Sequence, residues 1–249
     1  MFNYQLYSSR NFPPLEATLR MVKEAGYAGV EGFASMYPDV KAAQEVANAV
    51  AAAGLVMPTG HFALEMLEGD SDAVLAIARI LGVTMIICPH IMPDARPKDA
   101  AGWTALGVRL EVAAKPLLAA GFLVGWHNHD FEFVALPDGQ LPHDLIFAGA
   151  PSLGWEIDVA WVVKGGQDPM AFIKAYGDRI LTAHIKDIAP AGEKADEDGW
   201  ADAGTGVVAW PAIYRALKGT PCAHYIMEHD NPSDHARFAR VSIAAAQGW

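Results

Sequence analysis

Apolar and polar positions follow two alternating patterns along the chain. Short apolar runs typical of buried strands are followed by longer segments in which apolar residues recur every three or four positions, as in helices. The expected strands cover residues 3–7, 28–33, 55–62, 83–90, a segment that begins at 122, and 153–158, 180–185 and 224–228. The expected helices cover residues 15–25, 38–53, 70–81, 99–120, 141–148, 168–178, 207–218 and 233–246.

This alternation predicts the fold. Strands that alternate with helices are parallel and joined by right-handed crossovers, and about eight such units at this length favour a barrel. We therefore expect an α/β protein, a (β/α)8 TIM barrel in which residues 1–249 form a single domain, with residues 189–206 as a loop inside one unit. A doubly wound open sheet is the rival, but its glycine-rich first turn is missing, since SSRNFPP follows Tyr7.

Composition narrows the function classes. Of 249 residues, 52% are hydrophobic, enough for one sizeable core. The formal charge of −11, from 18 Lys and Arg against 29 Asp and Glu, argues against nucleic acid or an anionic membrane as the partner. A small molecule fits better, and the same balance disfavours a nuclease.

No segment resembles a secretion signal or a membrane span. Cys88 and Cys222 lie in apolar runs, which favours buried free thiols over a disulfide. We expect a soluble, cytoplasmic protein, and the sequence leaves a homo-oligomer open.

Polar residues with catalytic potential recur at the ends of the expected strands. A single histidine at such a place is usually structural, but here the pattern repeats about once in every unit. In a barrel, the carboxyl ends of all strands meet on one face, where active sites are built. The residues are Glu31, His61, His90, His127, Asp158, His184 and Glu228.

The densest stretch is FLVGWHNHDFEF, residues 122–133, in which a short apolar run gives way to imidazoles and carboxylates. Together with Asp158, His184 and Glu228, it offers the mixed nitrogen and oxygen donors that suit Mn2+, Co2+, Zn2+ or Mg2+. The fourth ligand would come from this stretch. His127, His129 and Glu132 all qualify chemically.

Six stretches together resemble the sugar phosphate isomerase/epimerase family of the xylose isomerase-like TIM barrels. They are GYAGVEGF, WHNHDFEF, EIDVAWVVKGGQDP, AHIKDI, GTGVVAW and IMEHD, and they span nearly the whole chain. Members of this family include ketose 3-epimerases, hydroxypyruvate isomerase, inosose dehydratase and the type IV apurinic endonucleases.

The resemblance implies one divalent ion, Mn2+ first, held by Glu, Asp, His and Glu from four successive late strands. Asp158, His184 and Glu228 match the last three ligands. The chain departs from the family at the first, where His127 stands in place of the glutamate. Either His127 binds the ion or Glu132 reaches back to it, and we expect Glu132, which preserves two glutamate ligands.

The expected chemistry is proton abstraction next to a carbonyl of a sugar-like substrate. The base is Glu228 or Glu132, or else His129, and Lys186 is expected to neutralise an oxyanion or a phosphate. Asp187 and Asp230 are expected to orient their neighbours. The expected substrate-binding residues are Glu31, His61, His90, His127 and Trp161.

These residues favour a metal-dependent isomerase or epimerase of a keto sugar or cyclitol. The alternative is a lyase that uses the same enolate chemistry, such as a dehydratase of an inosose or an eliminating enzyme on a 3-keto-glycoside. A sugar-binding protein without catalysis is the simplest rival.

Overall fold

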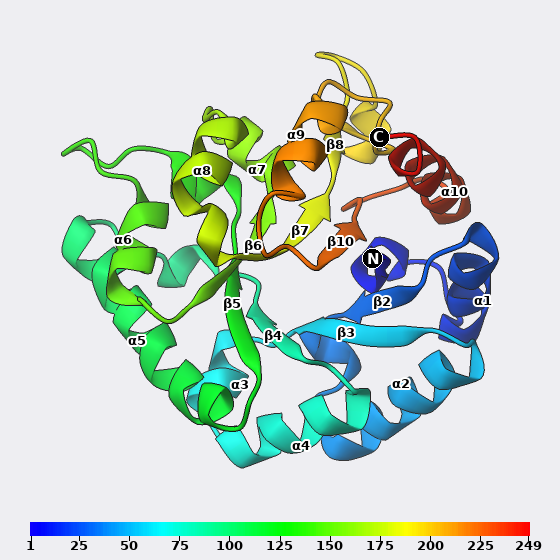
Figure 1. Ribbon diagram of the computed structural model, residues 1–249, viewed down its shortest axis with the longest axis horizontal. Helices are drawn as coiled ribbons and strands as arrows, with labels where there is room; N and C mark the ends of the chain where they lie inside the picture. The colour runs from blue at the N-terminus through cyan, green and yellow to red at the C-terminus, as the bar shows by residue number, and fades with distance from the viewer.

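Eight parallel strands close into a barrel with helices around it in the computed structural model, which describes residues 1–249 (Figure 1). The strands run round the barrel in sequence order, and the last pairs with the first. They are β1 (Phe2–Gln5), β2 (Gly29–Gly32), β3 (Val56–His61), β4 (Met85–Cys88), β5 (Leu123–His127), β6 (Gly154–Asp158), β7 (Ile180–Ile185) and β10 (His224–Met227). The predicted (β/α)8 barrel is confirmed.

Alternation along β6 shows how a strand builds both the core and the site. Trp155 and Ile157 are fully buried members of the hydrophobic core, whereas Glu156 and Asp158 are buried polar residues. Successive side chains of a strand point to opposite faces. The two carboxylates of β6 therefore share the side that faces the barrel interior.

The helices begin and end close to the expected positions. They are α1 (Leu15–Ala25), α2 (Val40–Ala52), α3 (Leu64–Glu68), α4 (Ser71–Leu81), α5 (Ala100–Ala119), α6 (Pro142–Gly149), α7 (Val159–Lys164), α8 (Pro169–Tyr176), α9 (Trp210–Leu217) and α10 (His235–Ala246). Asp39, Asp70 and Asp99 cap α2, α4 and α5 by accepting backbone N–H groups. Gly26 and Gly82 end α1 and α4 in the left-handed conformation.

Several short elements differ from the expectations. Helices α3 and α7 are about one turn long, too short to show helical periodicity in the sequence. The expected loop 189–206 contributes one strand, β9 (Trp200–Ala201), which pairs antiparallel with β8 (Asp187–Ile188). The first strand is shorter than expected, since residues after Gln5 form a 3-10 helix, η1 (Leu6–Ser9).

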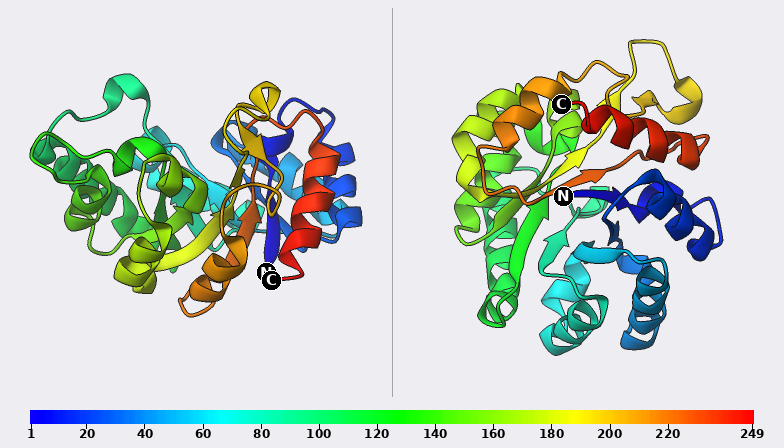
Figure 2. Two further views of the ribbon diagram at one scale, coloured as in Figure 1. Left: turned by 90° about the horizontal axis from the view of Figure 1, so that it is seen from above. Right: turned by 45° about the vertical axis from the view of Figure 1, so that its right-hand side comes forward.

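Helix α10 lies against α1 and so brings the end of the chain back to its beginning (Figure 2).

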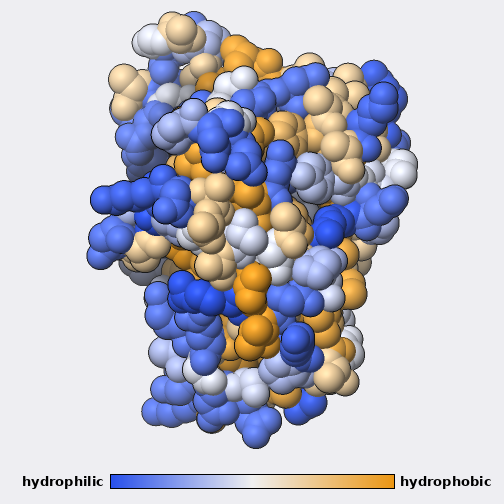
Figure 3. Space-filling model, turned by 90° about the vertical axis from the view of Figure 1, so that its left-hand side faces the viewer, coloured by the Kyte–Doolittle hydropathy of each residue, from blue (hydrophilic) through white to orange (hydrophobic).

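On the face over α5 and α6, apolar surface lies between polar side chains (Figure 3). Val108 and Val112 of α5 are among the exposed apolar residues, 49% and 58% exposed. A homo-oligomer stays a prediction. No helix has both the length and the apolar character that crossing a membrane requires.

Candidate active site

The barrel brings histidines and carboxylates from five strands to its carboxyl end. His61 ends β3, His127 ends β5 and Asp158 ends β6. His184 lies in β7, and Glu228 follows β10 directly. All five side chains are at least 94% buried. The expected convergence of strand ends is therefore present in the structure.

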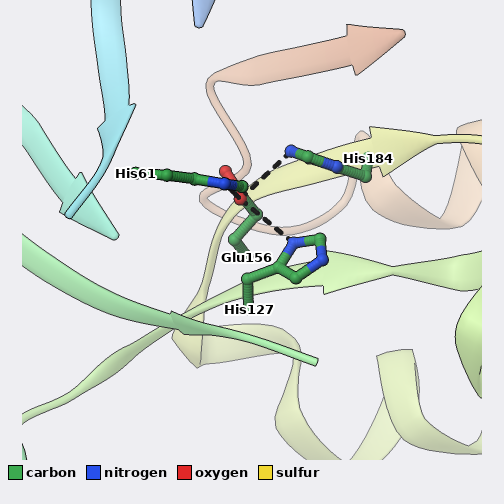
Figure 4. A group of neighbouring side chains, drawn as sticks. All are labelled: His61, His127, Glu156 and His184. Carbon is green, nitrogen blue, oxygen red and sulfur yellow. Dashed lines mark hydrogen bonds and ion pairs between the residues drawn. The ribbon is translucent and has the colours of Figure 1, made fainter. Parts of the chain in front are cut away.

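One cluster of these residues surrounds Glu156, and we call it the inner group: His61, His127, Glu156 and His184 (Figure 4). Glu156 Oε1 lies 2.6 Å from His61 Nε2, 3.1 Å from His184 Nε2 and 3.2 Å from His127 Nδ1. The Thr182 hydroxyl donates to the other oxygen at 2.5 Å. Burial raises the pKa of Glu156, but His184 and His61 lower it well below its usual value. Glu156 is therefore ionised.

Glu31, near the end of β2, contacts two histidines of the inner group. Its Oε1 lies 2.8 Å from His184 Nε2 and 3.1 Å from His61 Nε2, and Gln5 Nε2 donates to it at 2.8 Å. Burial lowers the pKa of His61, but Glu31 and Glu156 raise it to about 10. We expected Glu31 to bind substrate hydroxyls, but it is fully buried and does not line the cavity described below. Its contacts orient two histidines instead.

A second cluster lies nearer the rim, and we call it the rim group: His127, Asp158, His184 and Glu228. Each residue offers one ligand atom, and these atoms lie within 4.8 Å of one another. Asp158 Oδ2 is buried without a hydrogen-bond partner. Two imidazoles, two carboxylates and an unpartnered oxygen fit a divalent ion. The rim group is a candidate metal centre.

His184 belongs to both clusters through different ring nitrogens. Its Nδ1 lies 2.9 Å from Glu228 Oε2, whereas its Nε2 faces Glu31 and Glu156. A metal-binding histidine usually donates its second N–H to a carboxylate, which fixes the ring. If His184 binds an ion through Nδ1, the inner group therefore supplies that orienting carboxylate.

Glu132 does not join the rim group, contrary to our expectation. Trp126 Nε1 donates to its Oε2 at 2.6 Å, and the backbone N–H of His129 donates to its Oε1 at 2.9 Å. Both oxygens thus hold the turn after β5, and His127 occupies the fourth place in the rim group. Burial raises the pKa of Glu132 to about 8, with no contact to the other expected ligands.

Lys186 is enclosed by three carboxylates. Its Nζ lies 2.8 Å from Glu228 Oε2, 2.9 Å from Asp230 Oδ1 and 3.2 Å from Asp158 Oδ2. Burial lowers the pKa of Lys186, but these carboxylates raise it well above its usual value. The side chain is therefore a charged ammonium that is already paired.

A cavity of about 660 Å3 opens above these groups. It is lined by Tyr7, Phe33, Ala34, Ser35, His61, Ala63, Glu65, Pro89, His90, Met92, His127, His129, Lys186, Glu228 and Asp230. His129 Nδ1 is buried without a hydrogen-bond partner. Burial lowers the pKa of His129 well below its usual value, and the charges of His127 and Lys186 lower it further. A neutral imidazole of this kind is able to accept a proton.

Trp161 lies beside the cavity rather than in its wall. Its ring meets Trp200 edge to face at 4.7 Å and lies 5.4 Å from His129. We expected Trp161 to bind substrate, but it is absent from the cavity lining. Its contacts place it as a support for His129.

Glu156 is the site residue that the sequence reasoning missed. It comes two positions before Asp158, and residues two apart in a strand share a face. That spacing was the available signal. The carboxylate of Glu156 was overlooked because only residues at the ends of strands were considered, and Glu156 lies inside its strand.

Comparisons with known proteins agree with this fold. A family model described as "Xylose isomerase-like TIM barrel" matches residues 19–246. The rhizopine catabolism protein MocC of Rhizobium meliloti is 25% identical over 286 aligned positions, which cover 95% of this chain and 86% of MocC.

Two solved structures share the fold over nearly their whole length. A sugar phosphate isomerase/epimerase from Parabacteroides distasonis ATCC 8503 has a TM-score of 0.81 and 21% identity, covering 99% of this chain and 93% of that one. The 3-keto-D-glucoside 4-epimerase YcjR from E. coli has a TM-score of 0.72 and 16% identity, covering 100% of this chain and 99% of YcjR.

Proposed function

Because the chain belongs to the xylose isomerase-like TIM barrel family, we propose that it is a metal-dependent isomerase or epimerase of a keto sugar or a sugar-like molecule. The observation that carries the proposal is the rim group, whose four potential ligands lie together at one end of the barrel. Three of its neighbours in the cavity wall, His129, Lys186 and Asp230, are titratable as well.

Mn2+ is the ion that we propose, with Co2+, Zn2+ and Mg2+ as alternatives for the same donors. When bound by the rim group, a divalent ion supplies Lewis acidity, which makes the hydrogen next to a substrate carbonyl more acidic. The inner group supports this role by holding His184 and His127 in place. Its carboxylate, Glu156, contacts both rings.

His129 is the base that the contacts favour. Glu132 has both oxygens engaged by Trp126 and the backbone, and Glu228 is paired with Lys186 and His184. His129 has a free Nδ1, and its residue lines the cavity. Of the three bases considered, it alone lines the cavity and has a buried proton-accepting atom without a hydrogen-bond partner.

The proposed step moves one proton and one electron pair. His129 accepts the proton from the carbon beside the carbonyl, and the C–H electron pair forms a C=C bond while the carbonyl electrons move to oxygen. The ammonium of Lys186 lowers the energy of the negative oxygen. Return of the proton to the former carbonyl carbon gives an isomer, because the hydroxyl of the neighbouring carbon becomes the new carbonyl and passes its proton to the former carbonyl oxygen. Delivery of a proton to the opposite face of the carbon that lost it gives an epimer instead.

Metal content tests the first part of the proposal. Elemental analysis of the purified protein, reloaded with Mn2+, should find about one ion per chain, and Asp158→Asn should lose it. Asp144→Asn is the matched control, since Asp144 is a half-exposed carboxylate that bonds Tyr176 away from the cavity. A metal-free protein with full activity would contradict the proposal.

Hydrogen exchange tests the chemistry. The metal-loaded protein is incubated in D2O with a panel of ketoses and keto-glycosides, and the products are followed by mass spectrometry and NMR. Deuterium incorporation without loss of mass supports isomerisation or epimerisation, and His129→Gln should abolish it. Loss of water or of an aglycone would assign the enzyme to the lyases instead.

A further inference from the structure

We propose that the substrate of this enzyme carries no phosphate and presents an apolar second group to the rim above β1–β4. This inference rests on the proposed function, because it names the class of substrate for the same cavity. Four features of the structure support it. They are the division of the cavity wall, the pairing of its one lysine, the hydrogen bonds of the loop that follows β9, and the exposed apolar side chains at the cavity mouth.

The cavity wall is divided between two halves of the barrel. All five lining residues that follow β5, β7 and β10 are titratable: His127, His129, Lys186, Glu228 and Asp230. The ten lining residues that follow or end β1–β4 include one carboxylate, Glu65, two histidines and seven uncharged residues. The reacting carbonyl of the substrate therefore lies against the half above β5–β10. The remainder of the substrate meets the mostly apolar half above β1–β4.

The cavity has no spare cation for a phosphate. Lys186 is the single Lys or Arg in its lining, and three carboxylates lie within 3.2 Å of its ammonium. Arg10 lies over the Tyr7 ring at 4.0 Å and bonds backbone oxygens, and it does not line the cavity. A phosphate dianion would meet Glu65, Glu228 and Asp230 without a free partner.

The loop after β9 has no free glycine N–H groups that could bind a phosphate in place of a cation. In many TIM barrels the loops that follow the late strands bind phosphate through backbone N–H groups. Here the N–H groups of Gly204 and Gly206 donate to Asp187 Oδ2 at 2.9 and 3.0 Å, and that of Val208 donates to Oδ1 at 3.0 Å. The carboxylate of Asp187 therefore takes the position of an anion, so these donors are not free.

Exposed apolar side chains stand at the mouth of the cavity. Tyr7 and Met92 line it and are 38% and 57% exposed, although both are large apolar residues. Tyr7 meets Phe33 edge to face at 5.3 Å, which holds the two rings as one surface. Apolar surface of this kind binds an apolar or aromatic group and gains nothing from a phosphate. The cavity volume of about 660 Å3 lies within the usual range of roughly 300–1,000 Å3 for small-molecule sites.

Calorimetry with four probes tests the inference on the metal-loaded protein: a 4-nitrophenyl 3-keto-glucoside, the methyl 3-keto-glucoside, fructose and fructose 6-phosphate. We expect the aryl glycoside to bind at least about tenfold more tightly than the methyl glycoside. We expect no detectable binding of fructose 6-phosphate. Equal binding of the two glycosides, binding of the phosphate ester as tight as that of fructose, or binding of no probe would overturn the inference.

Variants locate the effect and separate it from the chemistry. Tyr7→Ala and Phe33→Ala should remove the preference for the aryl group and leave methyl-glycoside binding within about twofold, whereas Met170→Ala, on the exposed side of α8, should change neither. Loss of affinity for both glycosides alike would overturn the inference. Deuterium exchange on the same four compounds tests the proposed function separately, since tight aryl binding without deuterium incorporation would support this inference and contradict that function.

Discussion

Replacing Lys186 by methionine tests whether the paired ammonium holds the carboxylates of the site together. The change keeps the length of the side chain and removes its charge, so that Asp158, Glu228 and Asp230 lose the cation that lies 2.8–3.2 Å from them. Removing one partner of a buried ion pair costs about 3–5 kcal/mol, because the remaining charge is left uncompensated. Lys186 has three partners and is 1% exposed, so we expect the upper part of this range.

The assay is thermal and urea unfolding of chelator-treated protein at pH 7. One kcal/mol shifts Tm by about 2–4 °C in a chain of this size, so a loss of about 4–5 kcal/mol should lower the melting temperature of the Lys186→Met protein by roughly 8–20 °C. Adding Mn2+ should restore more stability to the variant than to wild type, because the ion meets no competing ammonium at Asp158 and Glu228.

Lys164→Met is the matched control. Lys164 is exposed, and its ammonium lies 3.5 Å from the centre of the Trp200 ring, an interaction of about 0.5–1 kcal/mol. Its melting temperature should therefore stay close to that of wild type. If the free energy of unfolding of metal-free Lys186→Met lies within about 1 kcal/mol of the wild-type value, the three ion pairs of Lys186 contribute little to stability and this prediction is wrong.

Three further predictions concern the metal, the loop after β9 and the effect of pH. His127→Gln should weaken Mn2+ binding at least about tenfold by calorimetry while Glu132→Gln keeps it, and the reverse order would restore Glu132 as the ligand. Asp187→Asn should lower the free energy of unfolding by about 2–4 kcal/mol in urea, because backbone N–H groups lose a charged acceptor, and an unchanged value would contradict this account. Despite burial, Ser233 and Arg237 lower the pKa of Glu197 well below 4.5, so its stabilisation is present above pH 4.5 and is lost as the pH falls below it. Glu197→Gln should accordingly lose less stability than wild type between pH 5 and pH 3, and parallel curves would argue against it.

Most of the fold followed from the hydrophobic pattern alone. Seven barrel strands were expected within two residues of both bounds, and the start of β5 within one, because each is a buried apolar run between a helix and a polar strand end. Helices α3 and α7 and the β8–β9 pair were missed because an element of two to six residues has too few positions to show a period.

The sequence predicted those site residues whose location depends only on their place at the end of a strand. Asp158, His184 and Glu228 lie at strand ends and meet as expected, because parallel strands deliver their ends to one face. The position of Glu132 depended on the direction of its side chain, which the indole N–H of Trp126 decides. No pattern of residue types records such a contact between side chains.

The divided cavity wall affects which residues of this protein tolerate substitution. In the half above β5–β10, Lys186 balances the charges of Glu228 and Asp230, so substitution of any of the three leaves an unpaired charge. Three lining residues of the half above β1–β4, Tyr7, Phe33 and Met92, are free of that constraint, since they contribute apolar surface to the cavity. Directed evolution toward new substrates should therefore accumulate its substitutions in the first half of the chain and leave the reactive residues of the second half untouched.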